Sequence, residues 1–163
     1  MTTAHDQICR TLAEFCHATD GGDFAAWVRL FTEDGAFHLL GQTYRGRAEL
    51  DSFIRQDQPP ERRGLHLTTD ALIDVAGDTA TVECRFLFVA AGSASPVLVA
   101  CGLYHDRLVR AGERWLFQDR ECALFAPPAT AGWGGGADVA NGHVPWWAVT
   151  RATPADQRQA PPA

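Results

Sequence analysis

The sequence has little of what marks a nucleic-acid-binding or membrane-spanning protein. Its 163 residues carry 14 basic against 20 acidic side chains, a formal net charge of -6. This balance argues against a surface that attracts phosphate backbones, so we expect no nucleic-acid partner. The longest uncharged run, residues 86–105, is interrupted by Gly92, Ser93, Ser95 and Pro96. It therefore predicts two strands joined by a turn, and no contact with a membrane.

Signals for export and for cysteine or metal chemistry are also lacking. Residues 1–10 contain no basic region followed by an apolar core, so we expect a cytoplasmic protein. The five cysteines are odd in number and include no Cys-x-x-Cys pair, which favours reduced core residues over a disulfide framework or a zinc site. The six histidines show no spacing that places two on one face of an element. We therefore expect no metal and no cofactor.

The composition favours one globular domain. Hydrophobic residues make up 46% and charged residues 21% of the chain, which is close to the average for globular proteins. A chain of this length is expected to form one core. We place the domain at residues 1–125. Residues 126–163 are rich in Pro, Gly and Ala and are predicted to be an extension with a disordered end.

The first third of the chain has the periodicity of helices. Apolar residues at three-and-four spacing predict a helix over about residues 5–19. Asp20 and two glycines follow, and glycine ends helices because it adopts the left-handed backbone. Asp23 is the predicted N-cap of a second helix over residues 24–31. A third, short helix is predicted at residues 48–56, before two prolines.

The rest of the chain has the pattern of strands. Residues 33–35 are predicted to form a turn, and residues 36–40 a short strand that returns as a hairpin through Thr43 and Tyr44. Four long extended segments follow, separated by short turn-forming stretches, at residues 65–75, 79–90, 97–110 and 115–125. Helices first and strands afterwards predict an α+β domain in which the helices cover one face of an antiparallel sheet.

Several segments, in this order, resemble the SnoaL-like branch of the nuclear transport factor 2 (NTF2)-like superfamily. They are the Asp20 break between two helices, LFTEDGAF at 30–37, Gly-Arg at 46–47, LHLTTDALIDVAGDTATVECRF at 65–86 and GLYHDRLVRAGERWLFQDR at 102–120. The resemblance implies an open cone, in which the N-terminal helices pack on a strongly bent, mostly antiparallel sheet and enclose a pocket. This fold hosts many activities, so it does not determine the chemistry.

The resemblance also implies a catalytic pair. Scytalone dehydratase and γ-hexachlorocyclohexane dehydrochlorinase pair a pocket aspartate, after the first helix, with a histidine early in the third strand. Asp20 and His66 fall on these positions. His66 would then remove a proton from carbon, while Asp20 fixes its tautomer and stabilises the imidazolium. Scytalone dehydratase has a second pocket histidine where this chain has Ala90, which leaves Tyr104 as a candidate hydrogen-bond donor to a carbonyl or leaving oxygen.

Each candidate also has a structural interpretation. Asp20 could be a solvated turn residue and His66 a satisfied core histidine. Alternation along a strand puts Tyr104 and His105 on opposite faces of the sheet, and the resemblance favours Tyr104 for the pocket. Arg120 could bind a substrate acid or pair with Asp119.

The residues predicted to bind substrate are Trp27, His38, Phe53, Phe88, Arg120 and Trp146. Trp146 and its neighbour Trp147 are predicted to close the pocket mouth or to be buried at a subunit contact, because two exposed tryptophans would favour aggregation.

These observations predict a cofactor-free lyase, isomerase or cyclase of dehydratase type. The resemblance implies a small hydrophobic substrate, such as a polyketide or steroid. Elimination, double-bond migration and ring closure share the first proton abstraction, so the pair alone does not separate them. The alternative is a non-catalytic NTF2-like subunit or ligand-binding domain, similar to the small β-subunit of ring-hydroxylating dioxygenases. The resemblance further implies a homodimer or homotrimer formed through the convex face of the sheet.

Overall fold

The computed structural model describes residues 2–91 and 95–125. Its elements are α1 (Ala4–Gly21), α2 (Phe24–Val28), β1 (Phe31–Leu39), β2 (Gln42–Arg45), α3 (Gly46–Asp57), a 3-10 turn (Pro60–Arg62), β3 (Leu65–Ala76), β4 (Thr79–Ala91), β5 (Pro96–Ala111) and β6 (Arg114–Leu124). The predicted extension, with Trp146, lies outside the described residues. No helix in the described part of the chain is long and apolar enough to span a membrane.

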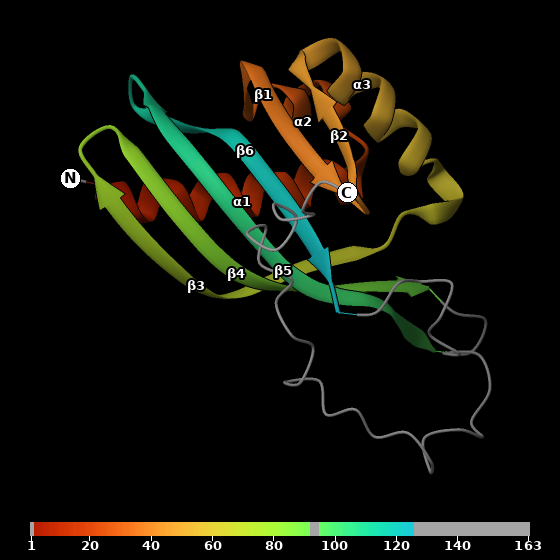
Figure 1. Cartoon of the computed structure of the whole chain (residues 1–163). Helices are drawn as coiled ribbons and strands as arrows, with labels where there is room; N and C mark the ends of the chain where they lie inside the picture. The colour runs from red at the N-terminus through yellow and green to blue at the C-terminus, as the bar shows by residue number, and fades with distance from the viewer. Residues whose placement is uncertain (1, 92–94, 126–163) are drawn as a thin grey trace, which may run out of the picture. The chain divides into compact units, whose positions relative to one another are not determined.

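One six-stranded sheet is formed, in the order β2-β1-β6-β5-β4-β3. Only the β1–β6 pair is parallel, and the other four neighbouring pairs are antiparallel. Figure 1 shows β3, β4 and β5 as long curved strands, with α1 lying across one face of the sheet. The predicted α+β layout, with helices covering one sheet face, is confirmed.

Local sequence accounts for the ends of the helices. Thr3 and Asp6 form a capping box at the start of α1, in which Asp6 N–H donates to Thr3 Oγ1 at 3.1 Å. Gly22 ends α1 with a left-handed φ of 72°. Asp23 caps α2, because its Oδ1 accepts from Ala26 N–H at 2.9 Å. The predicted N-cap at Asp23 is therefore confirmed.

The second helix and the turn after it were predicted wrongly. Helix α2 ends at Val28, and β1 runs without interruption through residues 33–35. The reason is tertiary: Phe31 pairs with Phe117 of β6, and the register shifts before Ala36 pairs with Asp119. This irregularity accommodates the extra residues, and the pairing with a strand distant in sequence overrides the local turn signal. The β1–β2 hairpin itself is confirmed.

An aromatic core joins the helices to the inner face of the sheet. The ring of Phe15 on α1 lies 5.4 Å from Trp27 and 5.8 Å from Phe117, measured between ring centroids. Trp27 and Phe117 are fully buried. Burying such a side chain contributes roughly 1.5–3 kcal/mol. This core therefore ties α1 and α2 to β6 and holds the helical side of the site in place.

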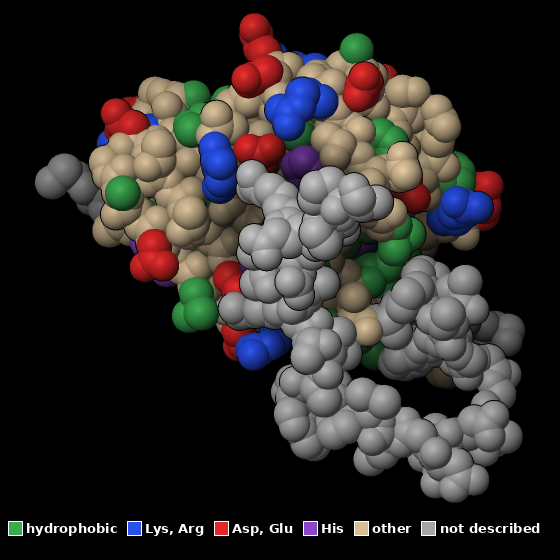
Figure 2. Space-filling model, viewed as in Figure 1, with side chains coloured by type: hydrophobic (Ala, Val, Ile, Leu, Met, Phe, Trp, Pro, Cys, Tyr) green, Lys and Arg blue, Asp and Glu red, His purple; other side chains and the backbone are tan. Residues whose placement is uncertain are grey.

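The outer surface carries both signs of charge. On the face shown in Figure 2, acidic and basic side chains are interspersed. The sheet also exposes large apolar side chains, and three of them, Leu65, Leu67 and Leu87, are between 39% and 61% exposed. Leu67 and Leu87 are paired across β3 and β4. They lie on the sheet face opposite His66, because successive side chains alternate.

Candidate active site

A cavity of about 480 Å³ lies between the helices and the inner face of the sheet. Its wall is largely aromatic and aliphatic, and the aromatic side chains that line it include Phe15, Trp27, Phe37, Phe53, Phe86 and Phe88. A volume of this size accommodates a small organic molecule. A few polar groups interrupt the apolar wall, which is the usual composition of a binding site for such a ligand.

Asp20 and His66 form the closest polar contact at this wall. Asp20 Oδ1 lies 2.6 Å from His66 Nδ1, and Asp20 Oδ2 accepts from the His66 backbone N–H at 2.9 Å. The side chains are only 17% and 11% exposed, respectively. Because the carboxylate accepts from Nδ1, it favours the tautomer with hydrogen on Nδ1. Nε2 then keeps its lone pair and can act as a base.

The fold brings this pair together from distant parts of the sequence. Asp20 lies in the last turn of α1, and His66 is the second residue of β3. The imidazole ring stacks on Phe88 of β4, with centroids 4.4 Å apart. A Cβ on Gly64 would approach the Val89 carbonyl oxygen to 2.3 Å, so only glycine permits the close approach of β3 to β4 just before His66.

Tyr104 also lines the cavity, as the resemblance implied. The residue is 3% exposed, and its ring stacks on Phe86 with centroids 4.5 Å apart. Among the described residues, its hydroxyl has no hydrogen-bond partner. Burial raises the pKa of Tyr104 well above its ordinary value. The phenol is therefore neutral at physiological pH and available as a donor to a ligand.

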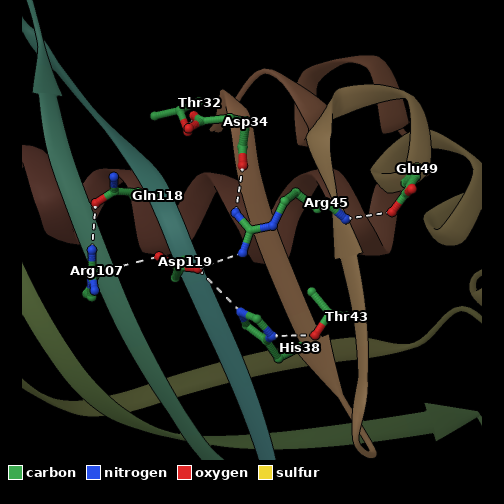
Figure 3. Close-up of polar contacts among 9 residues, drawn as sticks. All are labelled: Thr32, Asp34, His38, Thr43, Arg45, Glu49, Arg107, Gln118 and Asp119. Carbon is green, nitrogen blue, oxygen red and sulfur yellow. Dashed lines mark hydrogen bonds and ion pairs between the residues drawn. The ribbon is translucent and has the colours of Figure 1, made fainter.

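Only some of the residues predicted to bind substrate line the cavity. Trp27, Phe53 and Phe88 line the cavity, whereas His38 and Arg120 do not. His38 lies on the opposite face of β1 from Phe37, where Nδ1 is 2.9 Å from Thr43 Oγ1. Figure 3 shows His38 between Thr43 and Asp119.

Of the two alternatives for Arg120, pairing with Asp119 is wrong. These neighbours point to opposite faces of β6, because side chains alternate along a strand. Asp119 lies on the outer side, within 4 Å of His38, Arg45 and Arg107 (Figure 3). Arg120 points into the core, where its Nη1 is 3.3 Å from Asp106 Oδ2.

Sequence reasoning missed the polar residues that follow α3. Gln58, Glu61 and Arg62 line the cavity, and Glu61 and Arg62 are exposed. They mark the part of the cavity that reaches solvent. The two prolines at positions 59 and 60 indicated only a helix end. No local pattern places this segment at the cavity, because its position depends on how α3 packs on the sheet.

Within residues 2–91 and 95–125, no group of three or more His, Cys, Asp and Glu side chains is arranged to hold a metal ion. The cysteines at positions 16, 84 and 122 are buried. Burial raises the pKa of Cys84 and Cys122 to about 12. These two thiols are therefore neutral near pH 7.

The helices, the bent mixed sheet and the apolar cavity define an α+β protein of the NTF2-like fold. The SnoaL-like domain matches residues 1–121, and the chain belongs to this family. The resemblance seen in the sequence is thereby confirmed. No curated protein matches the chain.

Solved structures agree with this assignment. A single-residue variant of Rv3472 from Mycobacterium tuberculosis, a protein of unknown function, is 33% identical, with 72% of this chain and 69% of that chain covered and a TM-score of 0.69. An NTF2-like protein with a cystatin-like fold from Novosphingobium aromaticivorans is 26% identical, with 74% and 80% covered and a TM-score of 0.67. A candidate scytalone dehydratase from the same organism is 20% identical, with 74% and 83% covered and a TM-score of 0.65. This last likeness shows the fold alone.

Proposed function

We propose that the protein is a cofactor-free lyase, isomerase or cyclase that removes a C–H proton from a small hydrophobic substrate. The observation that carries this proposal is the contact of Asp20 with His66, 2.6 Å between Oδ1 and Nδ1, at the wall of an apolar cavity. A structural histidine in the core would not require a largely buried carboxylate on one ring nitrogen. This arrangement is the one a general base requires.

The chemistry follows from the positions of these groups. His66 Nε2 takes the proton, and the imidazolium that forms is stabilised by Asp20. The electron pair left on carbon is delocalised onto a neighbouring carbonyl oxygen of the substrate, where the Tyr104 hydroxyl donates a hydrogen bond. Loss of a leaving group, movement of a double bond or ring closure can each follow from this anion. The aromatic wall favours flat apolar substrates of polyketide or steroid type.

A generic C–H acid tests the base without knowledge of the substrate. In 5-nitrobenzisoxazole, a base removes the C3 proton, the C–H electrons form a nitrile, and the N–O bond breaks to release 2-cyano-4-nitrophenolate, which is yellow. We expect His66→Ala to lower the rate by roughly 10²–10⁴-fold. His38→Ala is the matched control, because His38 also contacts a carboxylate but lies outside the cavity, and it should retain the wild-type rate. Equal rates for both variants would overturn the proposal.

A non-catalytic role as a subunit or ligand-binding domain makes the opposite prediction. Such a protein would tolerate His66→Ala without loss of its function and would copurify with a larger partner. Turnover of the nitrobenzisoxazole that depends on His66 would exclude a purely structural role. The absence of such turnover, together with copurification, would favour the subunit.

We further propose that the protein is a cytoplasmic homodimer or homotrimer. The exposed apolar side chains of Leu65, Leu67 and Leu87 on the outer face of the sheet support association through that face. Light scattering coupled to size exclusion measures the oligomeric state. We expect Leu67→Glu with Leu87→Glu to give a monomer, and an unchanged mass would reject this face as the interface.

A further inference from the structure

An ion pair lies behind the cavity wall and takes no part in the chemistry described above. Arg120 and Asp106 are paired in register on β6 and β5, and both side chains are completely buried. Their charged atoms are 3.3 Å apart, yet neither side chain makes a hydrogen bond to the rest of the described chain. Buried polar atoms are normally hydrogen-bonded. A pair that leaves so many buried polar atoms without a hydrogen bond requires an explanation beyond stability.

The rings around Arg120 connect its charge to the cavity. The guanidinium carbon lies 3.8 Å from the centroid of Tyr104, 4.1 Å from Phe15 and 4.5 Å from Phe117. Such cation–π contacts stabilise a desolvated guanidinium. Tyr104 and Phe15 line the cavity, whereas Arg120 does not. The Tyr104 ring therefore lies between Phe86 and a positive charge, with its hydroxyl available to the cavity.

We propose that Arg120 is a positioning residue that strengthens the Tyr104 hydroxyl as a hydrogen-bond and proton donor. The acceptor would be the substrate oxygen on which negative charge develops when His66 removes the proton. A fixed positive charge against the ring stabilises the negative charge that the phenol oxygen gains as it gives up its proton. In the dry surroundings this attraction is strong, and the more distant Asp106 offsets it only in part. The proposal rests on the proposed function, because the substrate anion that Tyr104 would stabilise forms only when His66 removes the proton.

The other titratable groups around Tyr104 leave Arg120 as the principal charge. Burial raises the pKa of Tyr104, charges on Cys122 of β6, Cys16 of α1 and Asp106 of β5 act in the same direction, and Arg120 acts against them. Burial also raises the pKa of both thiols, so they are uncharged near neutral pH. Asp106 is the exception, since burial raises its pKa to about 7. Below that pH, the pair carries a net positive charge.

The chain has two tyrosines, which allows a direct measurement. In a Tyr44→Phe background, Tyr104 is the sole tyrosine and can be replaced biosynthetically by a fluorinated tyrosine, whose phenol is more acidic. Fluorine NMR against pH then gives its pKa without any substrate. Arg120→Met combined with Asp106→Leu removes both charges and keeps the core apolar. We expect the pKa of the fluorotyrosine to rise by about one pH unit or more.

Two further variants keep the test decisive. Arg107→Met removes an exposed cation on the outer face and should leave the fluorotyrosine pKa unchanged. Asp106→Asn keeps Arg120 and removes its counterion, which is ionised above pH 7. The pKa of the fluorotyrosine should therefore fall. This variant provides the test if the double variant does not fold. An unchanged pKa in every folded variant would overturn the proposal. A rate with nitrobenzisoxazole that is insensitive to His66→Ala would instead overturn the proposed function and leave this measurement standing.

Discussion

Two histidine–carboxylate pairs in this protein have the same side chains and different surroundings. Inside, Asp20 Oδ1 lies 2.6 Å from His66 Nδ1, and both side chains are less than one fifth exposed. Outside, Asp119 Oδ1 lies 3.4 Å from His38 Nε2, and both side chains are about one third exposed. The inner carboxylate is directed at one imidazole and one backbone N–H, whereas the outer one is shared with Arg45 and Arg107. The two pairs therefore differ in desolvation and in how many partners share the carboxylate, although their residue types are the same.

The largest expected effect is a difference in stability between the loss of a buried arginine and the loss of an exposed one. Arg120→Met leaves Asp106 unpaired in the core and should lower the free energy of unfolding by about 3 kcal/mol. Arg107→Met removes a weak, exposed contact with Asp119 and should cost under about 1 kcal/mol. Urea denaturation measures both. Equal costs would mean that the buried pair does not differ energetically from the surface one.

The two aspartates should differ almost as much in activity. Asp20→Asn keeps the shape of the side chain and loses the charge that stabilises the imidazolium, so nitrobenzisoxazole turnover should fall about 100-fold. Asp119→Asn is the matched change on the outer pair and should have an effect under about 2-fold. Steady-state rates at fixed protein concentration give both values. A similar loss in both variants would point to a global effect on the fold.

The buried carboxyl of Asp106 should make stability depend on pH. Burial raises its pKa from 3.8 to about 7. The folded protein therefore binds this proton more tightly than the unfolded chain, and its contribution to stability is complete below pH 3.8 and is lost as pH rises through about 7. Between pH 5 and pH 7, the free energy of unfolding of the wild type should fall by about 2 kcal/mol relative to that of Asp106→Asn. If the free energies of unfolding of the two proteins change with pH in the same way, the raised pKa of Asp106 is contradicted.

The smallest expected effect concerns the ring that supports His66. Phe88→Leu removes the stacked ring 4.4 Å from the imidazole and leaves the cavity apolar. Turnover should fall by about 3-fold to 10-fold, because the base is held less precisely. Leu87→Ala changes the neighbouring position on the outer face and serves as the control. A larger loss for Leu87→Ala would contradict the assignment of faces.

Much of the fold could be predicted because its signals are local. The helix of α1, the Asp23 cap and the four long strands follow from periodicity, glycine and turn chemistry. The turn expected at residues 33–35 failed because the parallel partner of β1, which overrides it, lies more than 80 positions further along the chain. Tertiary pairing of this kind leaves no trace in a short window of sequence.

The sequence by itself determined the order of the elements, the family and the two positions, Asp20 and His66, that could form a pair. Only the tertiary structure decided that their atoms meet, that Tyr104 reaches the cavity while His38 does not, and that Arg120 is buried with Asp106. The physical reason is that burial and partner choice depend on which strands are neighbours and on the face each side chain takes. Periodicity reveals a face, but packing determines what lies against it.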